Sequence, residues 1–367
     1  MTQMTEEQHL REYTKALKAR LPRHFFEPVR ARLVYFPIFV ALFLACAWGV
    51  VAAPWVWLKL LLALPIGYSF VGLGFWAHEV LHGAVVKSPI ARSLLGTAAF
   101  LPLLVGARLW RKWHNVEHHG QTQHPADDPD AMGALESAAQ KPFVKWMFKQ
   151  APALRSFFLF FSFTFWFSLH AHMMYRRFLP EFKPEERRVV TFQAALPFLF
   201  WAWVLLLVGP LNFVFVFVLP WMIGNFVAMS FIATNHLLNP ITETNDPLMN
   251  SLTVRNPGWL EWLTLGFGFH IEHHVFPVLS PKYGAQVAAE IKRLWPDRYN
   301  ELPHWKALFY LWKTPRLYRD HRNLIEPTTG RVFGSLGFGL DDGRVAGRQG
   351  RAAGSKKQAK AGKGRAG

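Results

Sequence analysis

Cysteine is nearly absent from this 367-residue sequence, in which Cys46 is the single one. One thiol excludes an internal disulfide, a cysteine-based zinc site and a cysteine-ligated iron–sulfur cluster, which needs about four thiolates. Charged residues are also scarce, at 18% against about 25% in an ordinary soluble domain. Hydrophobic residues, in contrast, make up 51% of the chain. These features together indicate a membrane protein.

Acidic residues are few relative to basic ones, with 24 Asp and Glu against 41 Lys and Arg, so the net charge is +17. Part of this excess lies in residues 341–367, which carry eight Lys and Arg, two Asp and mostly small or polar residues. Such a composition cannot bury a core, and we expect this tail to be disordered. Beside membrane segments, we expect it to contact anionic lipid rather than nucleic acid.

Four uncharged apolar segments are long enough to cross a bilayer, which takes about 20 residues. Residues 33–53 and 60–77 form one pair, and residues 189–208 and 213–234 form a second. The turns around Pro54 and Gly209 carry no charge, whereas the other ends of the segments are rich in Lys and Arg. The positive-inside rule therefore predicts two helical hairpins whose turns face out. Both termini are expected in the cytoplasm, and the location is expected to be a bacterial inner membrane.

Two further apolar stretches, residues 93–107 and 156–175, have basic residues at both ends. We interpret both as interfacial or re-entrant helices, with a fifth span as the alternative for residues 156–175. The predicted fold is thus an all-α integral membrane protein with four transmembrane helices in two hairpins, interfacial helices and a histidine-rich cytoplasmic cap. Its expected divisions are a cytoplasmic segment at 1–31, a membrane domain at 32–325 and a basic tail at 326–367.

Histidine is unusually frequent for such a chain, with 16 residues. Nine of them gather in HEVLH, HNVEHH, ATNHLLNP and HIEHH, where they are His78, His82, His114, His118, His119, His236, His270, His273 and His274. An H-x3-H spacing alone is a weak signal, whereas H-x3-HH and H-x2-HH are much rarer by chance. The predicted topology places all nine at the cytoplasmic boundary of the membrane. We expect His9, His24, His304 and His321 to be ordinary interfacial side chains.

Neutral imidazole is a good ligand for Fe, Zn, Cu and Ni. Nine imidazoles exceed the four positions of one tetrahedral zinc, and they match two metal ions with four or five nitrogens each. Glu79, Glu117 and Glu272 lie within the three histidine motifs, and we expect them to accept hydrogen bonds from imidazole N–H groups. As an alternative, they are solvated carboxylates on helix surfaces.

A short segment after the second motif, QTQHPADDPDA, also carries polar groups, namely His124, Asp127, Asp128 and Asp130. It is expected either to orient the second histidine motif or a substrate head group, or to form a plain proline-rich turn.

The motifs HEVLH, HNVEHH and HIEHH, in this order and around two hairpins, resemble the three histidine boxes of the membrane fatty acid desaturase family. The continuation HIEHHVFPVLSPKYG is similar to that family as well, and the resemblance covers roughly residues 70–284. It implies a non-haem di-iron centre that activates O2 and removes hydrogen from a methylene of an acyl lipid or acyl thioester. The eight box histidines match the family's ligands directly, and His236 matches its additional ligand.

Such a reaction needs two electrons, and the sequence has no obvious group to supply them. Iron–sulfur cysteines are missing, and the glycine runs LGFGFH and GSLGFGL lack the strand–turn–helix context of a dinucleotide site. We therefore expect a separate electron donor, such as a ferredoxin-type carrier, that docks on the basic cytoplasmic face.

Three other functions remain open from the sequence. HEVLH also matches the HExxH pattern of zinc proteases, with Glu79 as general base, although that function leaves seven histidines unused. A di-iron hydroxylase would have the same ligands, but the NYxEHYG-type segment usual in alkane hydroxylases is missing, which favours the desaturase. The third is a non-catalytic membrane receptor or carrier with a structural metal.

Overall fold

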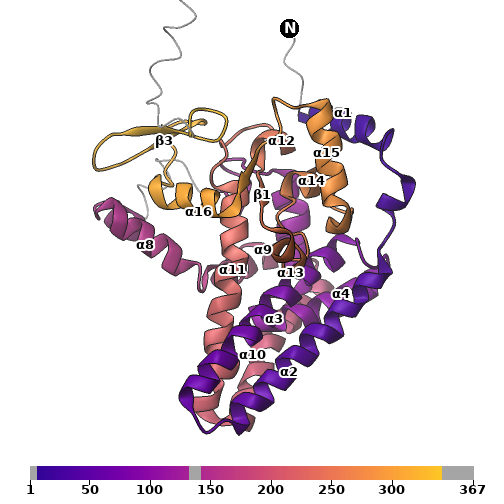
Figure 1. Cartoon of the computed structure of the whole chain (residues 1–367), viewed down its shortest axis with the longest axis vertical. Helices are drawn as coiled ribbons and strands as arrows, with labels where there is room; N and C mark the ends of the chain where they lie inside the picture. The colour runs from indigo at the N-terminus through magenta and orange to yellow at the C-terminus, as the bar shows by residue number, and fades with distance from the viewer. Residues whose placement is uncertain (1–5, 132–141, 341–367) are drawn as a thin grey trace, which may run out of the picture.

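The computed structural model describes residues 6–131 and 142–340, and these are mostly helical (Figure 1). The main elements are α1 (Glu6–Lys18), α2 (Tyr35–Ala52), α3 (Val56–His82), α4 (Pro89–Phe100), α5 (Ala107–Trp110), η4 (Arg111–His118), α7 (Pro142–Met147), α8 (Pro152–Ser162), α9 (Trp166–Phe178), α10 (Pro184–Phe213), η6 (Val214–Val218), α11 (Leu219–His236), α12 (Pro247–Asn250), β1 (Thr253–Arg255), α13 (Gly258–Leu263), α14 (His270–Val275), α15 (Gly284–Leu294), β2 (Glu301–Pro303), α16 (His304–Lys313), β3 (Asn323–Ile325) and β4 (Val332–Gly334). Short 3-10 turns are η1 (Arg23–Phe26), η2 (Arg30–Val34), η3 (Leu101–Leu103), η5 (Leu179–Glu181) and η7 (Pro281–Tyr283).

Within the described residues, three helical segments are long and apolar enough to cross a membrane. They are Arg30–Ala52, Val56–His82 and Pro184–His236, with mean hydropathies of 2.3, 1.7 and 2.4. The third segment is interrupted at Gly209, whose φ of 75° and ψ of 162° are not helical. Gly209 divides it into two arms that correspond to the two predicted segments 189–208 and 213–234. The chain is therefore a membrane protein, while the number of four crossings stays a prediction.

The two shorter apolar stretches are sharply bent rather than straight. Pro89–Leu103 meets Ala107–His118 at 98°, and Pro152–Ser162 meets Trp166–Glu181 at 72°. The first bend lies at Leu104, whose φ is 61°. The stretch predicted at 156–175 thus contains parts of two helices with different directions.

A positive charge lies at the end of the predicted turn of the first hairpin, so the expectation that this turn carries no charge is wrong. Lys59, near the start of α3, is buried, and its Nζ donates hydrogen bonds to the Val50 carbonyl at 2.6 Å and to Asn212 Oδ1 at 2.7 Å. Val50 is in α2 and Asn212 follows the break at Gly209. Lys59 therefore ties the end of one predicted hairpin to the end of the other.

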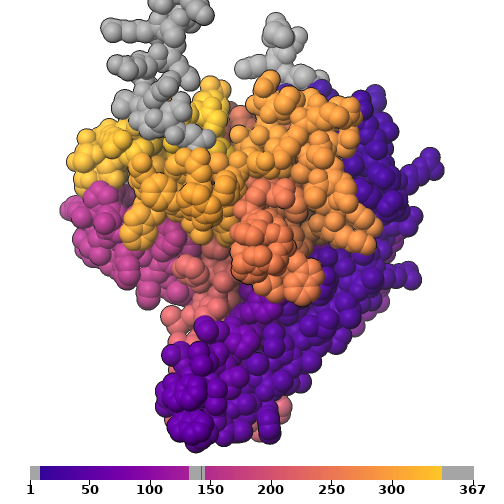
Figure 2. All heavy atoms as spheres, viewed as in Figure 1, coloured from indigo at the N-terminus to yellow at the C-terminus, as the bar shows by residue number. Residues whose placement is uncertain are grey.

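Short strands and helices occupy the end of the molecule opposite these turns (Figures 1 and 2). β1 and β2 pair in parallel, with Val254 opposite Leu302, and β3 and β4 pair antiparallel. The β3–β4 hairpin crosses the expected domain boundary at residue 325. The expected disordered tail, residues 341–367, lies outside the described residues.

The N-terminal helix is not separate from the rest. Tyr13 and Leu17 of α1 share a buried cluster with Ile271 and Val275 of α14 and with Val287 of α15. Helix α1, which belongs to the segment expected at 1–31, therefore packs directly against the third histidine motif.

We predict that Lys59→Met lowers the free energy of unfolding by about 1–3 kcal/mol, because the Val50 carbonyl and Asn212 lose their buried donor. Thermal or denaturant unfolding of the purified protein in detergent measures this change. Leu61→Met, at an exposed position of the same helix, is the matched control. Equal stability of the two variants would contradict the prediction.

Candidate metal centre

The nine histidines singled out in the sequence lie together in the structure. α3 ends with His78 and His82, and α11 ends with His236. The other six lie in η4 or directly after it (His114, His118 and His119) and in α14 (His270, His273 and His274). Eight of them are only 2–9% exposed, and His119 is partly exposed.

The second histidine motif is a π-helix, which explains how it can direct two adjacent histidines to one place. The His119 N–H donates to the His114 carbonyl, which is the i+5 to i pattern of a π-turn. In an α-helix of 3.6 residues per turn, His119 would point about 140° away from His114. Here its Nε2 lies 3.2 Å from His114 Nε2.

One group of imidazoles contains five residues. The ligand atoms of His78, His82, His114 and His273 all lie within 4.8 Å of one another. His119 joins them, since its Nε2 is also 3.0 Å from His273 Nε2. This group unites the first, second and third motifs.

The other group contains four imidazoles. The ligand atoms of His118, His236 and His274 lie within 4.8 Å of one another. His270 Nε2 is 2.7 Å from His236 Nε2 and 3.2 Å from His274 Nε2. The five-and-four division matches the two metal ions expected from the sequence.

The donor chemistry of both groups fits a transition-metal ion. A neutral imidazole has one N–H and one lone pair, and several Nε2 atoms converge here in a buried space. The buried Nε2 of His82 has no hydrogen-bond partner among the described residues. Burial and the neighbouring imidazoles hold the pKa of His270, His273 and His274 well below the ordinary value. These rings are therefore neutral at pH 7 and can offer a lone pair to a cation.

In three of the rings, the second nitrogen, Nδ1, contacts another group of the protein. These contacts orient the ring and therefore its Nε2. His118 Nδ1 lies 3.0 Å from Asp128 Oδ1, His236 Nδ1 lies 3.2 Å from the Asn250 carbonyl, and His274 Nδ1 lies 3.2 Å from Thr122 Oγ1. Such contacts fix the tautomer and the orientation of a metal-binding imidazole. Asp128 thus contacts a histidine of the second motif, in line with one of the alternatives expected for this segment.

The expected role of the three glutamates is wrong, because each carboxylate bonds elsewhere. Glu79 forms a buried ion pair with Arg32, and Glu117 accepts from Lys112 Nζ at 2.5 Å. Glu272 accepts from Thr253 Oγ1 at 2.7 Å and from Tyr299 at 2.5 Å. Burial raises the pKa of Glu272 to about 7 despite these two donors. Glu79 and Glu272 thus fasten their histidine motifs to other parts of the chain, whereas Glu117 bonds within η4.

Asp130 and His170 form a polar contact that the sequence did not predict. Asp130 accepts from Trp113 Nε1 at 2.9 Å, and one of its oxygens lies 2.8 Å from His170 Nε2. Burial alone would raise the pKa of Asp130, but the hydrogen bond from His170 and nearby positive charge lower it to about 2. One of two histidines in the mostly apolar run FSLHAHMMY gives no signal of this contact. His124 and Asp127 pair with each other at the surface.

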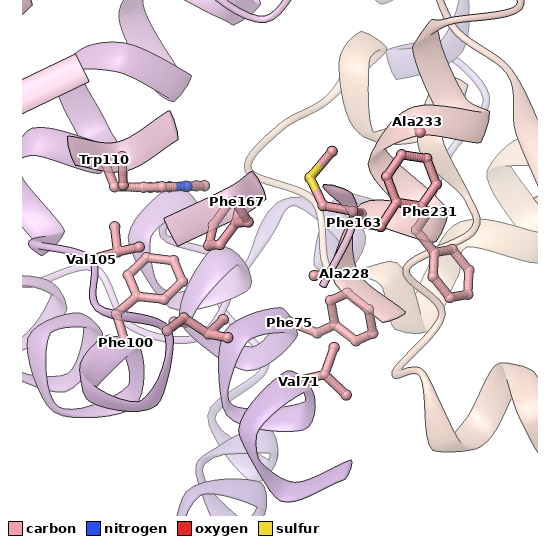
Figure 3. Close-up of a cluster of buried hydrophobic side chains, with 14 of the residues drawn as sticks. Val71, Phe75, Phe100, Val105, Trp110, Phe163, Phe167, Ala228, Phe231 and Ala233 are labelled. Atoms are coloured by element: carbon pink, nitrogen blue, oxygen red, sulfur yellow. The ribbon is translucent and has the colours of Figure 1, made fainter. Parts of the chain in front are cut away.

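An apolar cavity of about 200 Å³ adjoins the histidine cluster. Five of the nine histidines contribute to its wall: His78, His114, His118, His236 and His270. The rest of the wall is mainly aromatic and aliphatic, and Figure 3 shows Phe75, Phe100 and Phe167 among these buried side chains. The cavity can hold an apolar chain against the imidazoles.

Comparison with known proteins defines the family. Residues 55–306 match the family described as "Fatty acid desaturase", and the chain therefore belongs to the fatty acid desaturase family, whose members are oxidoreductases.

Named relatives are found in plants and cyanobacteria. The chain is 28% identical to "Omega-6 fatty acid desaturase, chloroplastic" of Brassica napus, over 74% of this chain and 62% of the relative. It is 27% identical to the protein of the same name in Arabidopsis thaliana, over 76% and 61%. A Synechocystis "sn-1 oleoyl-lipid 12-desaturase" is 25% identical over 78% and 82%. The match spans about three fifths of the length of the plant relatives.

We predict that Asp128→Ala weakens metal binding by about 10–100-fold, because His118 loses the group that orients it. Metal content after dialysis against a graded series of chelator concentrations measures the change. Asp127→Ala, in the same loop but exposed, is the matched control. Equal metal retention by both variants would show that Asp128 does not orient a ligand.

Proposed function

We propose that this protein is a di-iron fatty acid desaturase that uses O2 to introduce a carbon–carbon double bond into the acyl chain of a membrane lipid. The observation that carries the proposal is the cluster of nine imidazoles, five in one group and four in the other, beside an apolar cavity whose wall includes five of them. Membership of the desaturase family supports the same conclusion. The proposed iron ligands are His78, His82, His114, His119 and His273 for one ion and His118, His236, His270 and His274 for the other.

The overall reaction is –CH2–CH2– + O2 + 2 e⁻ + 2 H⁺ → –CH=CH– + 2 H2O. Two irons held by the imidazoles would supply the activation of O2. The chain's own contribution is to fix the imidazoles through Asp128, Asn250 and Thr122, and to place an acyl chain beside them in the cavity. Apolar walls such as Phe75 and Phe100 keep water from the reacting methylenes.

For the substrate, we propose an oleoyl chain esterified to a lipid, with the new double bond at carbon 12. The names of the relatives support this choice, since they describe omega-6 desaturases and sn-1 oleoyl-lipid 12-desaturases. Acyl thioesters are the other substrate class expected from the sequence, and product analysis separates the two.

The electrons would come from a separate carrier of the ferredoxin type. Cys46 is the only thiol of the chain, and the net charge of +17 favours an acidic partner. We propose that the protein lies in a bacterial inner membrane, with four crossings and with its termini and active site in the cytoplasm.

The geometry of Glu79 opposes the zinc-protease function. In such an enzyme the glutamate of HExxH must activate a metal-bound water. Here both carboxylate oxygens of Glu79 bond to the Arg32 guanidinium. The seven other histidines also belong to the same cluster as His78 and His82, whereas a zinc protease would leave them unused.

We predict that expression in a bacterium that makes oleoyl lipids, but no doubly unsaturated ones, produces a new chain with two double bonds. His270→Ala should reduce this product to background without preventing membrane insertion, and the same holds for His114, His118 and His273. Mass spectrometry of the lipid fatty acids measures the product and locates the bond. His124→Ala, in the surface pair with Asp127, is the control that should retain activity.

The same experiment tests the alternative chemistry. A hydroxylated chain in place of the doubly unsaturated one would replace the desaturase by a hydroxylase. Retained product in His270→Ala would contradict the proposed ligand set.

We also predict that the purified protein holds about two iron ions per chain, because the imidazoles form two groups. Elemental analysis by mass spectrometry gives the stoichiometry. Treatment with a chelator should remove iron and activity together, and ferrous iron should restore both. A content of one zinc ion per chain would overturn the di-iron proposal.

A further inference from the structure

Helix α16 has two apolar sides, and within the described residues only one of them is covered by protein. Ala307, Tyr310 and Leu311 are buried against the rest of the molecule. Trp305, Phe309 and Trp312 are 71%, 50% and 42% exposed. Their i, i+4, i+7 spacing places these three aromatic rings on one face of the helix.

Helix α13 presents a similar face. Trp259 and Trp262, one turn apart, are 67% and 66% exposed. The carbonyl of Leu263, at the end of α13, accepts a hydrogen bond from Tyr68 at 3.1 Å. Tyr68 belongs to the apolar segment Val56–His82 and lies about 15 Å along that helix from His78, in the direction of the hairpin turn. The exposed tryptophans of α13 therefore lie beside a membrane-crossing helix.

The start of α16 also lies beside such a segment. His304 Nε2 is 3.3 Å from the Ser230 carbonyl, and its ring centroid is 4.2 Å from that of Phe231. Ser230 and Phe231 are in α11, within the apolar segment Pro184–His236. Trp305 follows His304 directly, so its exposed side chain lies beside a part of α11 that is still apolar.

Helix α8 continues the aromatic surface of α16. Ser156 Oγ donates to the Trp312 carbonyl at 2.6 Å, and the rings of Phe160 and Trp312 are 5.5 Å apart. On the outer side of α8, Phe157 and Phe161 are 53% and 50% exposed. Figure 1 shows α8, α16 and α13 between the hairpins and the small sheets.

We propose that the exposed faces of α8, α13 and α16 lie in the interfacial region of the lipid bilayer and form a membrane-contacting rim around the predicted hairpins. The rim consists of Phe157, Phe161, Trp259, Trp262, Trp305, Phe309 and Trp312. Tryptophan and phenylalanine on one face of a short helix suit the boundary between head groups and acyl chains. Continuity with the apolar segments, through Tyr68 and Ser230, identifies lipid rather than another protein as the occupant.

Part of the cavity lies directly behind the rim. Leu159 and Ser162 of α8 line the cavity, while Phe157 and Phe161 of the same helix face outward. Only the thickness of one helix therefore separates the cavity from the lipid phase. The membrane contact itself does not depend on the proposed function.

Photo-crosslinking of the full chain in lipid nanodiscs tests the rim directly. Benzoylphenylalanine would replace Phe161, Trp262 or Trp305, one at a time, in nanodiscs of phosphatidylglycerol and phosphatidylethanolamine. Mass spectrometry should find lipid adducts at these positions at a yield several-fold above that at Ala289. Ala289 is exposed on α15, far from the hairpin turns in Figure 1.

Adducts with another protein chain, or a lipid yield no higher than at Ala289, would overturn the proposal. Because a replacement could disturb folding, a second measurement uses single cysteines at 262, 305 and 289 in a Cys46→Ser background. A water-soluble maleimide should label position 289 and leave 262 and 305 largely unmodified in nanodiscs. Equal labelling at the three positions would contradict membrane contact. Neither readout requires desaturase activity.

Discussion

The convergence of nine imidazoles in a buried space is the constraint on which the rest of the structure depends. Their Nε2 atoms approach one another as closely as 2.7 Å, although neutral rings with facing lone pairs repel each other. A cation bound by these lone pairs would make such a cluster favourable. Helices α3, η4, α11 and α14 must therefore bring their histidines to the same place, and the packing below them follows from this requirement.

Much of this centre was readable from the sequence because histidine spacing and hydrophobic length are local properties. All nine histidines were predicted as ligands from the sequence, since six of them stand in the H-x3-HH and H-x2-HH motifs that chance rarely produces. Which histidine belongs to which group was not predicted, because His119 joins His78 while its neighbour His118 joins His236. That division depends on the π-turn of η4 and on how four distant helices meet.

Polar contacts over long sequence distances were the least predictable part. The glutamates of the motifs were expected beside imidazoles, but Glu79 instead pairs with Arg32, 47 residues away. Asp130 contacts His170, which is 40 residues away in a mostly apolar stretch. The sequence also does not predict the aromatic faces of α13 and α16, because segments of 6 and 10 residues are too short for a hydropathy window that identifies spans.

The π-helical second motif has a consequence for how the two double-histidine motifs are related. In α14 an ordinary α-helix presents histidines at positions i, i+3 and i+4, whereas η4 presents them at i, i+4 and i+5. The two arrangements differ by one inserted residue, accommodated as a wider turn. Deleting one residue between His114 and His118 would convert H-x3-HH into H-x2-HH and return the helix to α geometry. The second and third motifs thus present three histidines each, one from a π-helix and the other from an α-helix.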